Sequence, residues 1–216
     1  MQTLSDLKLD YLDMYLIHWP LAFKFVGEDV NKDENVFPKT DDGKIARQNV
    51  PLRETWEEME KLVDEGLVKS IGISNFSPQL VYDLLTYARI KPACNQVESH
   101  PYLNQNGLIQ ASGDIAIVAY SPLGHMYESS PINNEKVKAM TTKYSKTAAQ
   151  VLLRWNLQRG CVVIPKSTNE ARIIENSQIF DFELSAEDME TLNNLEKEHK
   201  VRTCDPITFW GIPLFD

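Results

Sequence analysis

The sequence predicts an α/β protein built on a parallel sheet. Short apolar runs alternate along the chain with segments whose apolar residues recur at helical spacing. This alternation is typical of strand–helix–strand units, in which parallel strands are joined by right-handed crossovers. The chain has 216 residues and contains neither an internal repeat nor a low-complexity linker. We therefore expect a single domain over residues 1–216.

The first apolar run, Leu9–Pro20, reads LDYLDMYLIHWP. Its centre is aliphatic or aromatic apart from Asp13, which predicts a strand that is buried on both faces. Because proline cannot continue a central strand, we expect this strand to end near Trp19. His18 then lies at the carboxyl end of a buried strand, where α/β proteins bind ligands and perform chemistry.

The later elements continue the alternation. Residues 1–8 suit a helix, and residues 21–50 are polar, which predicts a long loop. Further apolar runs predict strands at 67–74, 92–98, 115–121 and 161–164. Helical spacing predicts helices at 51–66, from 77 onward, near 108–111, at 135–144, 147–157 and 170–177, and from 185 onward. We expect the apolar tail, residues 201–216, to be irregular.

Local signals define several helix ends. Ser77 is a suitable N-cap residue, and Pro78 follows it at the first helical position. Ser185 and Asp188 have the spacing of a capping box, which predicts a helix start there. Gly107 and Gly113 are expected to weaken the short helix in this segment, because each glycine costs about 1 kcal/mol relative to alanine inside a helix.

Composition excludes several classes of function. The net charge is −9 and no basic run is present, which argues against a nucleic-acid partner. The three cysteines are widely spaced and form no metal-binding motif, and their odd number fits a reducing compartment. No apolar run is long enough to cross a membrane, and no signal-peptide pattern opens the sequence. We therefore expect a cytoplasmic protein without a metal or a membrane partner.

The five expected strands suit either an open doubly wound sheet or part of a closed barrel. No GxGxxG motif follows any of them, so a Rossmann dinucleotide site is not supported. Five blocks of sequence occur in an order and spacing that resemble the aldo-keto reductases: LDYLDMYLIHWP, GLVKSIGISNFS, NQVESHPYLNQ, VAYSPLG and IPKSTNEARIIEN. The resemblance extends from Thr3 to about Leu195.

This resemblance implies a TIM (β/α)8 barrel, of which the chain would supply only the equivalents of strands 4 to 8. It also implies NADPH-dependent reduction of aldehydes or ketones to alcohols. In that role His18 would orient the substrate carbonyl and polarise it by a hydrogen bond. Its position alone is equally compatible with a structural histidine at a strand end.

The catalytic tyrosine, lysine and aspartate of the family would precede Met1. None of the tyrosines in the chain matches the family motif, including Tyr120, which has another expected role. We therefore expect this chain alone to show reductase activity at or near background. On this interpretation the chain is a fragment, a product that begins at an internal methionine, or the result of a truncated gene model. The alternatives are a catalytically inactive NADP(H)-binding or regulatory subunit and a truncated product without a folded role.

The resemblance assigns Ser74, Asn75 and Gln96 to the nicotinamide carboxamide of NADPH or NADP+. An amide needs paired donors and acceptors to be held in one orientation. Without the resemblance, turn and cap roles would be the more common explanation of such residues. Tyr120 is expected to stack on the nicotinamide ring, although a core tyrosine is the alternative. Ser121 and Leu123 would contact the pyrophosphate.

A second set of residues is expected at the 2′-phosphate of the cofactor. Lys166, Ser167 and Arg172 come just before and within the first turn of a helix, where free N–H groups favour an anion. A solvated basic pair is about as common on spacing alone. By the resemblance, Thr168 lies beside this clamp and Glu175 and Asn176 reach the adenine, although an exposed helix face would also explain Glu175. The set favours NADPH over NADH.

The substrate, a small-molecule carbonyl compound, would be enclosed by residues 21–50 and by the tail after Val201. The resemblance gives Trp19, Trp210 and Ile212 as pocket walls, whereas ordinary apolar packing is the alternative for Trp19. A complete barrel would be a monomer. A partial barrel has open sheet edges, which could support association with another chain.

Overall fold

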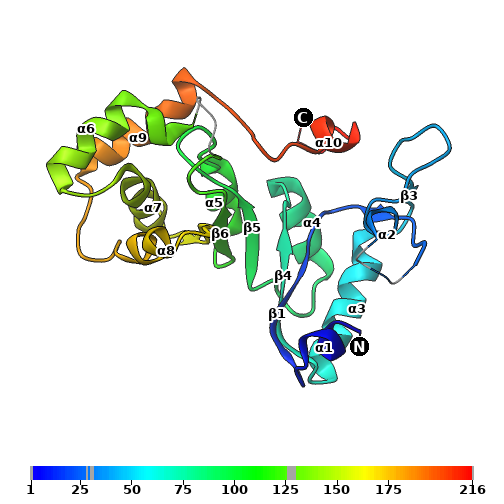
Figure 1. Cartoon of the computed structure of the whole chain (residues 1–216). Coiled ribbons are helices and arrows are strands. Elements are labelled where there is room, and N and C mark those ends of the chain that lie inside the picture. The colour runs from blue at the N-terminus through cyan, green and yellow to red at the C-terminus, as the bar shows by residue number, and fades with distance from the viewer. Residues whose placement is uncertain (1, 28, 30–31, 126–129, 216) are drawn as a thin grey trace. The chain divides into compact units, whose positions relative to one another are not determined.

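The computed structural model describes residues 2–27, 29, 32–125 and 130–215 (Figure 1). Contacts within the chain divide it into two compact units. The first unit comprises residues 1–93 and 205–216, and the second comprises residues 94–204. None of the helices in the described residues is long and apolar enough to cross a membrane.

The first unit is built on two parallel strands. Strand β1 (Leu12–Ile17) pairs with β4 (Val68–Ser74), and Ile17 lies opposite Ile73. Helix α3 (Leu52–Asp64) connects the two strands, α4 (Pro78–Tyr87) follows β4, and α1 (Gln2–Leu7) precedes β1. Trp56 of α3 is fully buried, and its indole Nε1 donates a hydrogen bond to the carbonyl of Ile90. The predicted helix at 51–66 and the predicted N-cap at Ser77, which accepts from Leu80 N, are both confirmed.

The prediction that β1 is buried on both faces is wrong. Tyr11, Met14 and Tyr15 are exposed by 42%, 43% and 37%. Strand β1 has β4 on one side and, within the described residues, no strand partner on the other. An apolar run of this kind is buried only where neighbours cover both of its faces, as they do for Ile71 and Ile73 of β4, which are 1% and 0% exposed.

Two segments that were expected to be irregular contain short elements. The predicted loop at 21–50 holds an antiparallel pair, β2 (Ala22–Phe23) with β3 (Arg47–Gln48), and a single helical turn, α2 (Asp33–Val36). In the tail, α10 (Pro206–Trp210) forms because Asp205 accepts a hydrogen bond from Ile207 N and a proline follows it at the first helical position. The expectation of a wholly irregular tail is therefore corrected.

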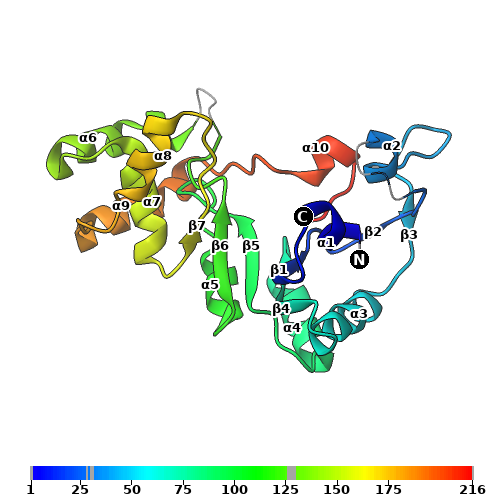
Figure 2. The same cartoon turned by 60° about the horizontal axis from the view of Figure 1, so that its bottom comes forward.

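The second unit holds three parallel strands and a group of helices. Strand β6 (Ala116–Tyr120) pairs with β5 (Cys94–Glu98) and with β7 (Val162–Val163). The helical elements are α5 (Asn106–Ser112), the 3-10 turn η1 (Pro131–Asn133), α6 (Glu135–Tyr144), α7 (Ala148–Gln158), α8 (Glu170–Ser177) and α9 (Ala186–Glu198). Helices α6, α7 and α9 lie together (Figure 2) around a core of Val137, Met140, Val151, Leu152, Trp155, Leu192 and Leu195.

Two helix-end predictions in this unit need adjustment. Gly113 does not lie within α5 but directly follows it, at φ 54°, a conformation that glycine adopts more readily than other residues. At the start of α9, Ser185 Oγ accepts from Asp188 N as predicted. The Ser185 N–H, however, donates to the hydroxyl of Tyr144 at 2.8 Å. In a capping box the Asp188 carboxylate would accept this hydrogen bond from Ser185 N, but here Tyr144 of α6 accepts it.

Candidate functional site

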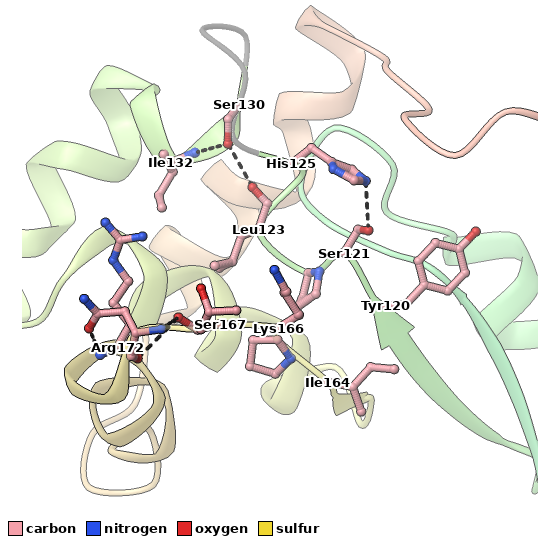
Figure 3. A pocket seen from close by; sticks show the side chains of 14 residues that line it. Tyr120, Ser121, Leu123, His125, Ser130, Ile132, Ile164, Lys166, Ser167 and Arg172 are labelled. Atoms are coloured by element: carbon pink, nitrogen blue, oxygen red, sulfur yellow. Dashed lines mark hydrogen bonds between the residues drawn. The ribbon is translucent and has the colours of Figure 1, made fainter. Parts of the chain in front are cut away.

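A cavity of about 690 Å³ lies in the second unit where β6 and β7 end (Figure 3). Its walls come from the turn after Tyr120, from η1, and from the segment that leads from β7 into α8. The lining residues are Tyr120, Ser121, Pro122, Leu123, His125, Ser130, Ile132, Ile164, Pro165, Lys166, Ser167, Thr168, Asn169 and Arg172. The volume suits a small-molecule ligand.

The charges around this cavity favour an anion. Lys166 and Arg172 line it, and no Asp or Glu is among the lining residues given above, although the chain carries 31 acidic residues. Other cations of the second unit are paired, for example Lys146 with Asp181 and Arg154 with Glu183. Within the described residues, neither Lys166 nor Arg172 forms an ion pair. Both charges are therefore available to a ligand.

The turn after β6 gives this cavity a fixed wall. Gly124 N donates to Ser121 O at 2.8 Å, and Ser130 Oγ donates to Leu123 O at 2.9 Å. Gly124 has φ 69°, and a Cβ at this position would lie 2.6 Å from Cδ of Pro131. Only glycine satisfies both the conformation and the close approach. The backbone of Leu123 is consequently held at the edge of the cavity.

The wall after β7 is shaped by the start of α8. Asn169 caps this helix, since its Oδ1 accepts from Arg172 N at 3.1 Å, and Ser167 Oγ accepts from Asn169 N at 3.1 Å. These bonds fix the backbone between Lys166 and Arg172. The two cationic side chains are thus carried by an ordered turn, and both line the same cavity (Figure 3).

A buried carboxylate lies at the end of β5, and the sequence analysis missed it. Glu98 Oε1 accepts from Thr203 N at 2.8 Å and from Thr203 Oγ1 at 2.6 Å, and Oε2 accepts from Cys204 N at 2.8 Å. His100 Nε2 lies 2.8 Å from Oε1. Burial by itself raises the pKa of Glu98, but these hydrogen bonds outweigh it and lower the pKa to about 2. Glu98 therefore fastens residues 203–204 as a carboxylate.

Tyr120 is poorly suited to proton transfer. Burial raises the pKa of its phenol, and negative charge on Cys204, where that thiol is ionised, and on Glu98 raises it further. A tyrosine that gives up its proton near neutral pH needs a lowered pKa. The electrostatics therefore support the expectation that Tyr120 does not replace the catalytic tyrosine of the family.

The second unit brings together most of the expected cofactor residues. Those that line the cavity are Tyr120, Ser121, Leu123, Lys166, Ser167, Thr168 and Arg172. Gln96 lies on β5, and Glu175 and Asn176 lie further along α8, outside the lining set. The carboxylate of Glu175 accepts a hydrogen bond from Thr147 Oγ1 at 2.7 Å, which joins α8 to the start of α7. The cofactor roles of all these expected residues stay predictions.

The first unit holds the remaining expected residues. His18 is exposed at the end of β1, and Asn75 Nδ2 donates to its carbonyl at 2.9 Å and to Ser74 Oγ at 3.2 Å. Asn75 has φ 62° and is 3% exposed. Through the two hydrogen bonds, its buried amide joins the carboxyl ends of β1 and β4. This contact gives Asn75 a structural role beside its predicted cofactor role.

An aromatic cluster connects the tail to the segment after β1. The ring of Trp210 lies edge-on to Trp19, with centroids 5.0 Å apart, and edge-on to Phe23 at 5.2 Å. Trp210 also borders a second cavity, of about 880 Å³, together with Asp33, Glu34, Phe37, Lys39, Ile45 and Phe209. Ile212, two residues after Trp210, is half-buried, and its N–H donates to Pro206 O at 3.4 Å. The segment at 21–50 and the tail therefore share one cavity, whose lining contains Trp210 but neither Trp19 nor Ile212, and its role as a substrate pocket stays a prediction.

Comparison with known proteins identifies the family. The model of the aldo/keto reductase family matches residues 1–197. The chain is 52% identical over 217 residues to aldose reductase B of Dictyostelium discoideum, covering 100% of this chain and 68% of that protein. It is 46% identical over 206 residues to aldo-keto reductase family 1 member A1 of Gallus gallus, covering 91% and 61%.

Solved structures give the same result. Aldose reductase from Giardia lamblia superposes with a TM-score of 0.89 at 40% identity, covering 100% of this chain and 71% of that structure. Aldose reductase from Schistosoma japonicum gives 0.87 at 41% identity, covering 99% and 67%. The chain belongs to the aldo/keto reductase family. It spans 68% and 61% of the lengths of the two curated relatives described above.

Proposed function

We propose that this chain forms the cofactor-binding and substrate-enclosing part of an NADPH-dependent carbonyl reductase. The reaction is the reduction of an aldehyde or ketone to an alcohol. The observation that carries the proposal is the cavity beside β6 and β7, which has two unpaired cations and no carboxylate among its described lining residues. In fold terms, the chain corresponds to strands 4 to 8 of a TIM barrel.

The donor set of the cavity fits a phosphorylated dinucleotide. Lys166, Ser167 and Arg172 supply two positive charges and a hydroxyl for the 2′-phosphate, which NADH lacks. Ser121 supplies a hydroxyl, and the fixed turn of Leu123 offers backbone groups to the pyrophosphate. Tyr120 presents a ring whose phenol stays protonated, which suits stacking on the nicotinamide.

The cofactor, when bound, supplies the hydride that reaches the carbonyl carbon. His18 polarises the carbonyl oxygen by a hydrogen bond, and Trp19, Trp210 and Ile212 exclude water from the apolar part of the substrate. A tyrosine donates the proton in this family. Because no tyrosine of this chain matches that motif, we propose that the isolated chain reduces aldehydes at or near background.

A second candidate follows from the same observations. The cavity is present, while the phenol nearest to it, Tyr120, has a raised pKa. A chain with these properties binds NADPH without turning it over and acts as a regulatory subunit. Among the described residues, no strand pairs with the outer edge of β1, and Tyr11 before this strand and Met14 and Tyr15 within it are exposed, which offers a surface for association with another chain.

Two measurements on the purified chain test what both candidates predict, which is NADPH binding without robust turnover. NADPH binding is followed by quenching of tryptophan fluorescence, and turnover by loss of NADPH absorbance with an aromatic aldehyde. We expect saturable binding with turnover at background. Robust turnover would contradict the proposed background activity and exclude the regulatory subunit, whereas absence of binding would contradict the cofactor site on which both candidates depend.

A further inference from the structure

We propose that Glu98 is a positioning residue for the nicotinamide half of the cofactor, and that it acts by holding Cys204 against Tyr120. The inference rests on the proposed cofactor site and adds to it a residue that acts without touching the ligand. Glu98 is fully buried and is not among the lining residues of the cavity, whereas Tyr120 lines it.

The register of the sheet places the carboxylate and the phenol on the same face. Strands β5 and β6 are parallel, with Glu98 opposite Tyr120, and Ser99 N donates to Tyr120 O at 3.3 Å. Residues in register on neighbouring strands project to the same side of a sheet. Figure 3 shows Tyr120 on the side of the cavity away from Arg172, with Lys166 between them. Tyr120 therefore borders the part of the cavity that is remote from the expected 2′-phosphate site.

The two oxygens of the Glu98 carboxylate hold different tail residues. Oε1 accepts from Thr203 N and Thr203 Oγ1, and Oε2 accepts from Cys204 N at 2.8 Å. A carboxylate has acceptor sites on both oxygens and carries no hydrogen, so it satisfies both consecutive N–H groups. A glutamine amide has only one oxygen. If that oxygen stays with Thr203, the NH2 group faces the N–H of Cys204, donor against donor, and Cys204 is released.

Cys204 connects this carboxylate to the wall of the cavity. Burial and the charge of Glu98 raise the pKa of its thiol. Hydrogen bonds with the side chains of Ser121, Thr203 and Tyr120 lower that pKa, so the sulfur lies within reach of all three. Cys204 is not among the described lining residues of the cavity. Its position therefore affects a ligand through the ring of Tyr120, which the thiol supports.

The test separates the two halves of the cofactor. Isothermal titration calorimetry measures the dissociation constants of NADP+ and of 2′,5′-ADP, which carries the adenosine and the 2′-phosphate but no nicotinamide. A displacement of Tyr120 raises the ratio of the NADP+ constant to the 2′,5′-ADP constant, whereas a general loss of structure weakens both ligands alike. The variants are Glu98→Gln and Cys204→Ala. The second keeps every backbone donor to Glu98 and decides the question if the first does not fold.

Asp188→Asn is the matched control. Its side chain is also nearly buried in the second unit, and its carboxylate accepts from Lys143 Nζ at 2.6 Å and from Ser185 Oγ at 2.9 Å. It makes the same change from carboxylate to amide, but it lies outside the cavity lining. A merely structural role of Glu98 would make Glu98→Gln and Asp188→Asn behave alike toward the two ligands.

We expect Glu98→Gln to raise the NADP+ dissociation constant about tenfold and that of 2′,5′-ADP by less than about twofold. Cys204→Ala should raise the ratio about threefold, and Asp188→Asn should leave it at the wild-type value. An unchanged ratio in folded Glu98→Gln, or in Cys204→Ala where Glu98→Gln does not fold, would overturn this inference alone. An equal change in Asp188→Asn would do the same. If the wild type binds neither ligand, the proposed cofactor site is overturned as well.

Discussion

The Nε2 atom of His100 lies 2.8 Å from Oε1 of Glu98, and both side chains are buried in the second unit. An ionised carboxylate can only accept hydrogen bonds, so Nε2 of His100 carries the hydrogen. His100 Nδ1 has no hydrogen-bond partner within the described part of the chain. The same carboxylate holds Thr203 and Cys204, directly before the tail residue Asp205 that caps α10. Glu98 thus fastens residues 203–204 within the second unit.

This relationship predicts a loss of stability in acid. The pKa of Glu98 is lowered from 4.5 to about 2, so its stabilising contribution is complete above about pH 4.5 and is lost as the pH falls towards 2. We expect Glu98→Gln to lower the free energy of urea unfolding at pH 7 by on the order of 3 kcal/mol. The difference between wild type and variant should shrink below pH 4. Glu135→Gln, at an exposed ion pair, is the control, and equal stability of wild type and Glu98→Gln at pH 7 would refute the prediction.

Replacement of Gly124 tests the wall of the cofactor cavity. In Gly124→Ala the new Cβ would lie 2.6 Å from Pro131 and the residue would keep φ 69°. Gly160→Ala is a matched control, because Gly160 has φ 78° but no heavy atom within 4 Å of a new Cβ. We expect a cost of about 1 kcal/mol for Gly160→Ala, from backbone strain alone, and about 2 kcal/mol or more for Gly124→Ala.

Only Gly124→Ala should also weaken NADP+ binding, since the displaced turn carries Ser121 and Leu123. Urea unfolding and fluorescence titration measure the two effects. Equal losses of stability in the two variants would show that Pro131 can move away at no cost.

Trp210 and its neighbour Phe209 provide a second matched pair. Trp210 contacts Trp19, Phe23 and Phe37, with ring centroids 5.0, 5.2 and 6.0 Å away, whereas Phe209 is 62% exposed. Each aromatic pair contributes about 0.5–1.5 kcal/mol. We expect Trp210→Ala to lower the free energy of unfolding by about 2 kcal/mol and Phe209→Ala by less than about 0.5 kcal/mol. A larger effect at Phe209 would contradict the assignment of Trp210 as the packed wall.

Local signals made much of the fold predictable. Helices α6 and α8 have the predicted bounds, Glu135–Tyr144 and Glu170–Ser177, because residues within a few positions set their period and caps. The burial of β1 was not predictable, because it depends on what covers the strand. The turn α10 escaped notice because its five residues are too few to show a period.

The candidate site likewise has residues whose placement could be predicted from the sequence and residues whose placement could not. Lys166, Ser167 and Arg172 lie within seven residues of one another, so their convergence on one cavity could be predicted from the sequence. Glu98 was missed because its partners, Thr203 and Cys204, are more than 100 residues away along the chain.

The most direct test of the cofactor site compares NADPH with NADH. Dissociation constants are measured by tryptophan quenching for wild type, for Lys166→Ala with Arg172→Ala, and for Lys138→Ala with Lys197→Ala. The last variant removes the same charge from exposed positions outside the cavity. We predict that wild type and this control prefer NADPH by at least about 100-fold, and that loss of the cavity cations reduces the preference to nearly one. Equal binding of NADPH and NADH by wild type, or a preference that persists without both cations, would contradict the proposed site.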